Sequence, residues 1–250
     1  MKQTIEILRE TFPDRPEMGP ALSRVLLDQV ATGERPATAR LSRPGRVVAF
    51  GRRDTRAPGY AGAVTAAREH GFAAMERLTG GRAAAYSEGA LSITLTIADP
   101  TPAKGTNQRF HDAAEIVRAA FESLGIDARI GEVPGEYCPG DYSVNARGET
   151  KLAGIGQRLI KGAAHVGFVI VVSGPDLIRK VLDPVYAALD LEWNPGTVGA
   201  VGEEVDADRE RVESALLEQI ESRYRVRPVT LDQATLGLAE ASAARFRSPG

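Results

Sequence analysis

The sequence predicts an α/β (α+β) protein in which helices pack on a mixed, largely antiparallel sheet. Three observations lead to this prediction. Apolar residues recur at both helical and strand spacing, the two kinds of segment do not alternate in a strict strand–helix–strand rhythm, and glycine and proline turn signals separate the short apolar runs. No repeat, low-complexity tract or composition break divides the chain, so one domain over residues 1–250 is expected.

The elements of the N-terminal half follow from the helical or strand spacing of their apolar residues. A helix is expected over residues 21–31 because its apolar residues fall on one face and Gly33 follows it. The runs 37–42 and 45–51 are typical of two strands of a hairpin or of a sheet edge. Further along, a helix is expected over 60–71 and strands over 72–78 and 90–98.

The C-terminal half begins with the clearest helix, residues 106–125, for which Thr106 is the candidate N-cap and Gly125 the stop. Short strands are expected at 128–131, 141–145, 150–157 and 165–172. Two helices, 176–187 and 206–224, are expected to close the chain, and the last residues, 242–250, are expected to be frayed.

Composition excludes several classes of function. The 31 basic and 33 acidic residues give a net charge of −2, so no basic surface for nucleic acid is expected. One cysteine and three scattered histidines give neither a disulfide nor a metal site. The longest apolar run, 166–172, is far too short to span a bilayer, and the first residues lack the apolar core of a signal peptide. A soluble cytoplasmic protein without metal is therefore expected.

Common nucleotide and hydrolase motifs are absent from the sequence. There is no phosphate loop of the G-x-x-x-x-G-K-[ST] kind and no G-x-S-x-G nucleophile elbow. The run GIGQRL at Gly154 begins like a dinucleotide fingerprint but has Leu159 where the third glycine is required.

Three blocks in fixed order carry the chemistry that remains. They are RLTGGRAAAYSEGAL (77–91), YCPGDYSV (137–144) and KLAGIGQR (151–158). A lone cysteine is most often a core residue, but the Pro-Gly that follows Cys138 indicates a loop. Lys151 opens an otherwise apolar, glycine-rich strand, and the two glycines of the first block allow a backbone to approach a ligand closely.

In this order and spacing the blocks resemble the lipoate-protein ligase and octanoyltransferase family, whose members attach lipoyl or octanoyl groups to a lysine of a carrier domain. The resemblance runs from about Ala21 to about Ala188. It implies a catalytic domain of the biotin/lipoate-protein ligase type, with a class II synthetase-like fold, a core at about 21–190 and a C-terminal helical extension over 191–250. The middle block is most similar to the cysteine-dependent branch, the octanoyl-[GcvH]:protein N-octanoyltransferases.

The resemblance implies a role for each matching residue. Cys138 takes the place of the nucleophile and Lys151 that of the catalytic lysine. The implied substrate-binding residues are Arg77, Thr79, Gly80, Gly81, Ala83, Tyr86, Gly154, Ile155 and Gly156. Lys151 is expected to lower the pKa of the thiol and to donate to the acyl carbonyl, aided by amides of the TGG loop. The small residues 83–85 and the strand LAGIG are expected to line an apolar acyl slot.

Three functions remain open on the sequence. The first is a transferase that passes an octanoyl or lipoyl group through a Cys138 thioester and needs no cofactor. The second is an ATP- and Mg-dependent ligase, although Arg82, Tyr86 and Ala90 stand where such ligases usually carry glycine, histidine and asparagine. The third is a non-catalytic binder of lipoyl domains.

The expected partners are lipoyl carrier domains, namely the glycine-cleavage H protein and the E2 subunits of 2-oxoacid dehydrogenases, with acyl carrier protein as another donor. A monomer is expected. The sequence leaves open whether the acyl group is octanoyl or lipoyl and which donor supplies it.

Overall fold

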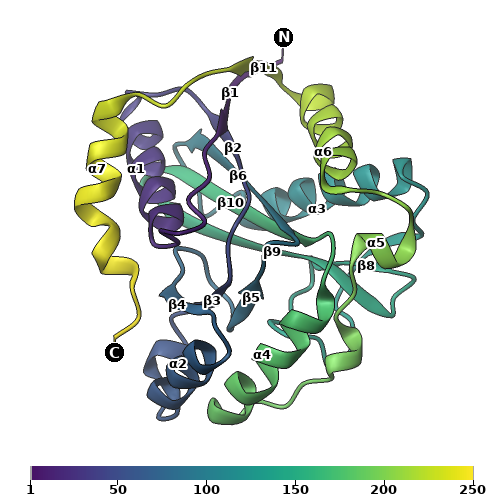
Figure 1. Cartoon of the computed structure of the whole chain (residues 1–250). Helices are drawn as coiled ribbons and strands as arrows, with labels where there is room; N and C mark the ends of the chain where they lie inside the picture. Colours follow the sequence, from purple (N-terminus) through teal and green to yellow (C-terminus); the bar gives the residue numbers. More distant parts are fainter. Residues whose placement is uncertain (1, 250) are drawn as a thin grey trace.

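A large mixed sheet forms the centre of the molecule in the computed structural model, which describes residues 2–249 (Figure 1). Its strands lie in the order β11-β1-β2-β6-β10-β9-β8-β7. Their bounds are β1 Thr4–Arg9, β2 Thr38–Ser42, β6 Ala90–Asp99, β7 Ala128–Ile130, β8 Val144–Ala146, β9 Thr150–Ile160, β10 Gly162–Val171 and β11 Arg225–Pro228. The strand β1 runs parallel to both of its neighbours, and the other pairs are antiparallel, which confirms the mixed, largely antiparallel sheet.

Helices cover both faces of this sheet. On one face lies α1 (Met18–Thr32), against which α7 (Gln233–Ala243) packs, as Figure 1 shows on the left. On the other face lie α3 (Thr106–Ser123) and α6 (Arg209–Arg223), and the main apolar cluster fills the space between them and the sheet. The sheet is therefore the middle layer of a helix–sheet–helix arrangement.

A second, smaller sheet lies beside α1 and carries its own helices. Its strands are β4 (Ala73–Glu76), β3 (Val47–Phe50) and β5 (Ala84–Tyr86), in that order. The helices α2 (Tyr60–Glu69) and α4 (Pro175–Ala188) pack on it through a separate apolar cluster. A short helix, α5 (Val201–Glu204), and 3-10 turns at Asp54–Arg56, Pro195–Thr197 and Ala244–Phe246 complete the structure.

The two faces of the central strands differ sharply in chemistry. Along β2, β6, β10 and β9, one set of alternate residues is apolar and joins the cluster with α3. The opposite set is mostly polar or glycine and forms rows across the sheet, of which one is Arg40–Thr94–Gly167–Gly156 and the next is Ser42–Ser92–Val169–Gly154. This second face forms the floor of the cavity described below.

Several expectations about the elements are wrong. The strands β2 and β3 do not form a hairpin, because β2 pairs with β1 and β6 in the large sheet while β3 is the middle strand of the small one. The sequence patterns also missed β1, β11 and α7. In β1 the pattern fails because Glu6 is buried, which is possible only because Arg35 and Arg227 both pair with it.

The last described residues, up to Pro249, are docked rather than frayed, and Gly250 lies outside the described part of the chain. Arg247 pairs with Met75 of β4 in an isolated antiparallel bridge, and its guanidinium donates to Glu17 at 2.7 Å. Ser248 is buried, and its hydroxyl accepts a hydrogen bond from Tyr60 at 2.8 Å. No helix within residues 2–249 is long and apolar enough to cross a membrane.

Candidate active site

Cys138 lies in the loop between β7 and β8 and has an unusual backbone. Its φ is 43°, in the left-handed region that few residues other than glycine adopt. The strained conformation is held by α4, because the Tyr186 hydroxyl accepts a hydrogen bond from the Cys138 amide at 2.7 Å and donates to the Ala83 carbonyl at 3.0 Å. The loop is thereby tied to the segment that leads into β5.

The sulfur of Cys138 points at the loop between β4 and β5. It accepts hydrogen bonds from Nη2 of Arg77 at 3.1 Å and from the backbone N–H of Arg82 at 3.3 Å. The same Nη2 donates to the Arg82 carbonyl at 2.6 Å, and the Arg82 side chain is held by the buried Asp54 at 3.1 Å. Two donors, one of them the Arg77 cation, therefore contact the sulfur from one side.

Gly81 is required for this approach. Its φ is 106°, and a Cβ added there would lie 2.2 Å from Nη2 of Arg77 and 2.8 Å from the sulfur of Cys138. Gly80, in contrast, has no heavy atom within 4 Å of such a Cβ. The second glycine of the TGG run thus lets the loop meet the thiol, whereas the first has no such constraint.

These contacts lower the pKa of the Cys138 thiol. Burial works in the opposite direction and raises the pKa, but the Arg77 charge, the Lys151 charge and the hydrogen bonds from Arg77 and Arg82 outweigh it. The thiolate, which is the nucleophilic form, is favoured. Arg77 contributes more to this than Lys151, which was the cation expected from the sequence.

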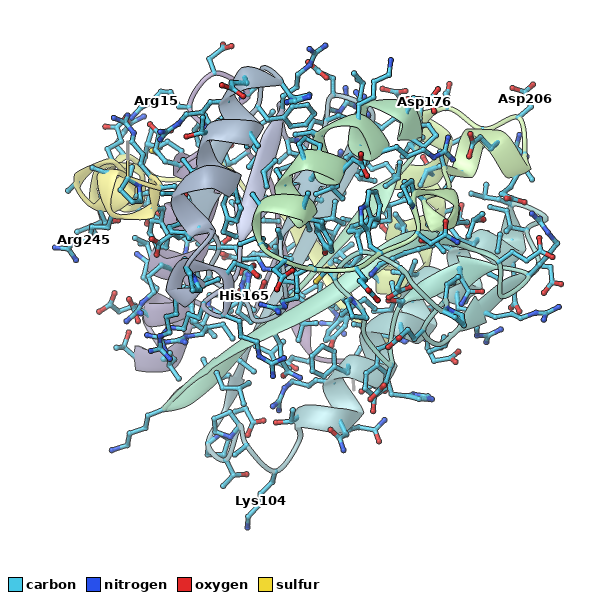
Figure 2. The ribbon with its side chains drawn as sticks, turned by 90° about the horizontal axis from the view of Figure 1, so that it is seen from below. Arg15, Lys104, His165, Asp176, Asp206 and Arg245 are labelled. Carbon is cyan, nitrogen blue, oxygen red and sulfur yellow. The ribbon has the colours of Figure 1, made fainter. Side chains whose placement is uncertain are left out.

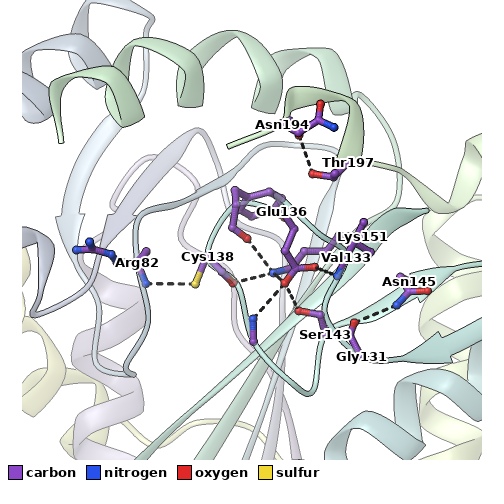
Figure 3. A network of polar contacts seen from close by, with 12 residues as sticks. Arg82, Gly131, Val133, Glu136, Cys138, Ser143, Asn145, Lys151, Asn194 and Thr197 are labelled. Atoms are coloured by element: carbon purple, nitrogen blue, oxygen red, sulfur yellow. Dashed lines mark hydrogen bonds and ion pairs between the residues drawn. The ribbon is translucent and has the colours of Figure 1, made fainter. Parts of the chain in front are cut away.

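Lys151 is buried, with 1% of its surface exposed, and its ammonium has three acceptors (Figure 3). These are Oε1 of Glu136 at 2.9 Å and the carbonyls of Tyr137 at 3.0 Å and Cys138 at 2.9 Å. Glu136 is buried too and also accepts from Ser143, Gly140 and Val133. Because a lysine has three N–H donors, Lys151 is fully engaged in holding the cysteine loop.

A β-bulge explains why Lys151 faces the cavity. Val144 pairs with Ala153, but Asn145 pairs with Lys151, so the register shifts by one residue between them. Strict alternation would put Lys151 on the apolar face with Ala153, opposite Gly154. The extra residue moves it to the face of Gly154, where a Cβ would lie 3.3 Å from its Cε.

These groups border a cavity of about 500 Å³ between the large sheet, the small sheet and α1. Of the residues implied to be catalytic or substrate-binding, all except Ala83 line it: Arg77, Thr79, Gly80, Gly81, Tyr86, Cys138, Lys151, Gly154, Ile155 and Gly156. The expectation that all of 83–85 and LAGIG line the slot is wrong for Ala85, Leu152 and Ala153, which are buried in the apolar clusters instead. Ala83 is buried in the apolar cluster between the small sheet and α4, while Ala84 borders the cavity. The glycines of β9 leave room above the sheet, and Thr79 fills part of the space over Gly156.

Sequence reasoning missed Glu136, Tyr186, Asp54 and the backbone N–H of Arg82. Only Glu136 left a signal, because an acid stands two residues before the cysteine and a buried lysine requires a compensating charge. The other three contacts depend on loop conformation and on α4, which no local pattern reports. Within residues 2–249, no group of three or more His, Cys, Asp or Glu side chains is placed to hold a metal ion.

Comparison with known proteins identifies the family to which the chain is similar. The sequence model of one protein family, the lipoyl protein ligase A/B catalytic domain, matches residues 15–218. An octanoyl-[GcvH]:protein N-octanoyltransferase of Bacillus velezensis is 31% identical over 195 residues, which are 72% of this chain and 68% of the relative. A protein of the same name from Geobacillus kaustophilus is 29% identical over 162 residues, 65% of this chain but only 57% of the relative.

Solved structures share the fold. A putative lipoate protein ligase of Thermoplasma acidophilum with bound lipoic acid has a TM-score of 0.76 at 21% identity, covering 98% of this chain and 96% of the other. A lipoate-protein ligase A bound with ATP has a TM-score of 0.77 at 21% identity, covering 98% and 95%. These matches confirm the ligase-type fold that the three sequence blocks implied. The chain belongs to the lipoyl protein ligase A/B catalytic domain family.

Proposed function

We propose that this protein is a cysteine-dependent acyltransferase of protein lipoylation, which moves an octanoyl or lipoyl group onto a lysine of a lipoyl carrier domain. The observation that carries the proposal is the sulfur of Cys138, hydrogen-bonded by Arg77 and the Arg82 amide at the wall of a cavity. Two relatives that are 31% and 29% identical to the chain are named octanoyl-[GcvH]:protein N-octanoyltransferases, which supports the same reaction.

The reaction has two steps. The Cys138 thiolate attacks the acyl carbonyl of the donor, a thioester forms as the bond to the leaving group breaks, and the leaving group takes a proton from the solvent, to which the thiol lost its own. The amine of the acceptor lysine then attacks the thioester, an amide forms, the amine loses its proton and Cys138 is released as the thiolate. Both steps develop negative charge on the carbonyl oxygen, which needs donors close to the sulfur.

The donors for that oxygen are best supplied by the loop of Arg77 to Arg82. The backbone N–H groups of Gly80 and Gly81 donate to no partner within residues 2–249, and this loop already contacts the sulfur. Lys151 could donate to the acyl oxygen only by exchanging one of its three present bonds. Its proposed role here is to fix the cysteine loop and to add positive charge near the thiolate.

The ATP-dependent ligase remains the second candidate, because one structural neighbour is a ligase bound with ATP. Two features favour the transferase. The Arg82 side chain, which stands where the ligases usually carry glycine, is engaged with Asp54 of the 3-10 turn that follows β3. Ala90, which stands in place of an asparagine, is fully buried at the start of β6.

Intact-protein mass spectrometry tests the proposal. The protein is mixed with an octanoylated H protein without ATP, and an adduct of one octanoyl group that hydroxylamine removes is expected. Cys138→Ser should form no such adduct and should not acylate a second lipoyl domain. An absence of adduct, followed by acylation of the lipoyl domain when ATP, magnesium and the free acid are added, would establish the ligase instead. Binding without transfer under both conditions would identify a non-catalytic binder.

A further inference from the structure

Tyr186 carries a buried hydroxyl that contacts the backbone of the proposed nucleophile. It lies in the last turn of α4, whose first turn carries the exposed Asp176 at the edge of the molecule (Figure 2). Tyr186 itself is 2% exposed. Its hydroxyl accepts from the Cys138 amide at 2.7 Å and donates to the Ala83 carbonyl at 3.0 Å, so it is engaged with the main chain as donor and as acceptor.

The ring of Tyr186 is held by aromatic neighbours. The ring centroid of Trp193 lies 5.3 Å from that of Tyr186 in a tilted arrangement and 6.5 Å from that of Tyr137 in an edge-to-face arrangement. The backbone N–H of Asn194 donates to the Gly135 carbonyl at 2.8 Å. The segment that follows α4 therefore packs against the cysteine loop, and the hydroxyl of Tyr186 has little freedom to move.

Hydrogen bonds restrain Cys138 on both sides of its α-carbon. Lys151 donates to the Cys138 carbonyl at 2.9 Å, and the Tyr186 hydroxyl accepts from the amide. The left-handed φ of 43° between them is costly for a residue with a side chain. Because φ sets the direction of the Cα–Cβ bond relative to the preceding peptide, relaxation of this angle would move the sulfur away from Arg77 and the Arg82 amide.

The bond to Tyr186 also occupies the amide of the nucleophile. In serine proteases the N–H of the nucleophilic residue is one of the donors to the oxyanion. Here the Cys138 N–H points at Tyr186, which agrees with the assignment of that task to the amides of Gly80 and Gly81. Tyr186 is not among the residues that line the cavity, so its hydroxyl can act on the reaction only through the cysteine.

We propose that Tyr186 is a positioning residue, whose hydroxyl holds the left-handed backbone of Cys138 so that the sulfur stays against its two donors in its reactive form. The consequence for acyl transfer rests on the proposed function. Burial raises the pKa of Tyr186, so the hydroxyl keeps its proton over the range in which a thiol titrates. Without the hydroxyl, the Cys138 N–H and the Ala83 carbonyl lose their partner, and the strained angle can relax.

Alkylation of Cys138 by iodoacetamide tests the inference without an acyl donor. In Tyr186→Phe the midpoint of the pH profile should move upward, and the rate at pH 7 should fall by about twofold to fivefold, the range that the loss of one hydrogen bond supports. Tyr60→Phe is the matched control, because it also removes a buried tyrosine hydroxyl, which donates to Ser248 at 2.8 Å. It should leave the profile unchanged. A profile of Tyr186→Phe that coincides with that of the unmodified protein, or an equal shift in Tyr60→Phe, would overturn the inference.

Steady-state kinetics with an octanoylated H protein separate positioning from substrate binding. In Tyr186→Phe kcat should fall while KM stays unchanged, because the hydroxyl does not touch the acyl group. A rise in KM with an unchanged kcat would overturn the inference. If the unmodified protein forms no acyl adduct at all, the transferase proposal fails, and the alkylation profiles then decide the role of Tyr186 by themselves.

Hydrogen exchange in the unmodified protein needs no variant. The Cys138 amide should exchange more slowly than the Gly80 amide, which has no partner within residues 2–249, by about tenfold or more. Equal rates would overturn the inference. A failure of Tyr186→Phe to fold would leave this measurement intact.

Discussion

Two buried cations share one face of the sheet, and they differ in their partners. Lys151 donates to three acceptors, one of them the carboxylate of Glu136. Arg40 has two acceptors for one of its nitrogens and none for the other two. Both groups line the same cavity, at opposite ends of it.

The difference separates a buried charge that is fully satisfied within the protein from one that is only partly satisfied. A buried charge is tolerated when hydrogen bonds and an opposite charge replace the lost water. Lys151 meets that condition within the protein, so its removal should disturb the fold of the cysteine loop. Arg40 does not, so its removal should cost little stability. Four predictions follow in order of decreasing effect, and the first and the last of them test this contrast.

Removing the partner of Lys151 should have the largest effect. Glu136→Ala leaves a buried ammonium without its counter-ion and strips acceptors from Ser143, Gly140 and Val133. Breaking a buried ion pair in this way costs ~3–5 kcal/mol of the free energy of unfolding, which urea denaturation would measure. Glu132→Ala, in the same loop but exposed, should change it by less than ~0.5 kcal/mol. Equal losses in the two variants would show that Glu136 does not support Lys151.

The second-largest effect is expected on the reactivity of Cys138 when Arg77, the cation beside its sulfur, is removed. Because the thiol pKa is lowered, the rate of alkylation by iodoacetamide should rise with pH at a midpoint below the ~8.5 of an ordinary cysteine. Arg77→Met should move that midpoint upward and slow alkylation at pH 7, because the loss of the Arg77 charge and hydrogen bond reduces the fraction of thiolate. Arg53→Met, at an exposed arginine, should leave the profile unchanged. A profile of Arg77→Met that coincides with the unmodified protein would assign the shift to another group.

The sequence was sufficient for the parts of the site that depend on local chemistry. Pro139 and Gly140 placed the cysteine in a loop, and the apolar run around Lys151 predicted a buried lysine, which it is. The three blocks gave the family and the fold. Each of these features is carried by residue type at a short spacing, which a single sequence displays directly.

The parts that could not be predicted depend on register and on distant contacts. The face on which Lys151 lies is set by a bulge opposite β8, and a one-residue shift reverses every side chain in a strand. The sulfur is held by a loop 56 to 61 residues earlier in the chain, and the cysteine backbone by α4, 48 residues later. In the sequence, Arg40 is one charged residue within an expected strand. Only the pairing of β2 with β6 shows that it lies on the cavity face of the sheet.

The two glycines of the TGG run should respond unequally to the same substitution. Gly81→Ala places a methyl group between Arg77 and the sulfur at a positive φ, so it should cost ~1–2 kcal/mol of stability and also slow alkylation of Cys138. Gly80→Ala meets no atom within 4 Å and should change stability by less than ~0.5 kcal/mol. Thermal unfolding and the alkylation rate measured on both variants check this. Similar behaviour of the two would contradict the close approach at Gly81.

The smallest effect on stability is expected from replacing Arg40, a buried cation with two unpartnered nitrogens. Arg40→Met removes a cation whose burial already lowers its pKa to about 10 and replaces it with an apolar chain of similar length. Replacing a poorly compensated buried charge in this way is often neutral or stabilising, so the free energy of unfolding should change by less than ~1 kcal/mol in urea. The change should also be independent of pH between 6 and 8, where Arg40 stays protonated and His165 neutral. A loss comparable to that of Glu136→Ala would mean that the bonds to Gly19 and Ser23 hold α1 on the sheet, and that Arg40, like Lys151, is a structural cation.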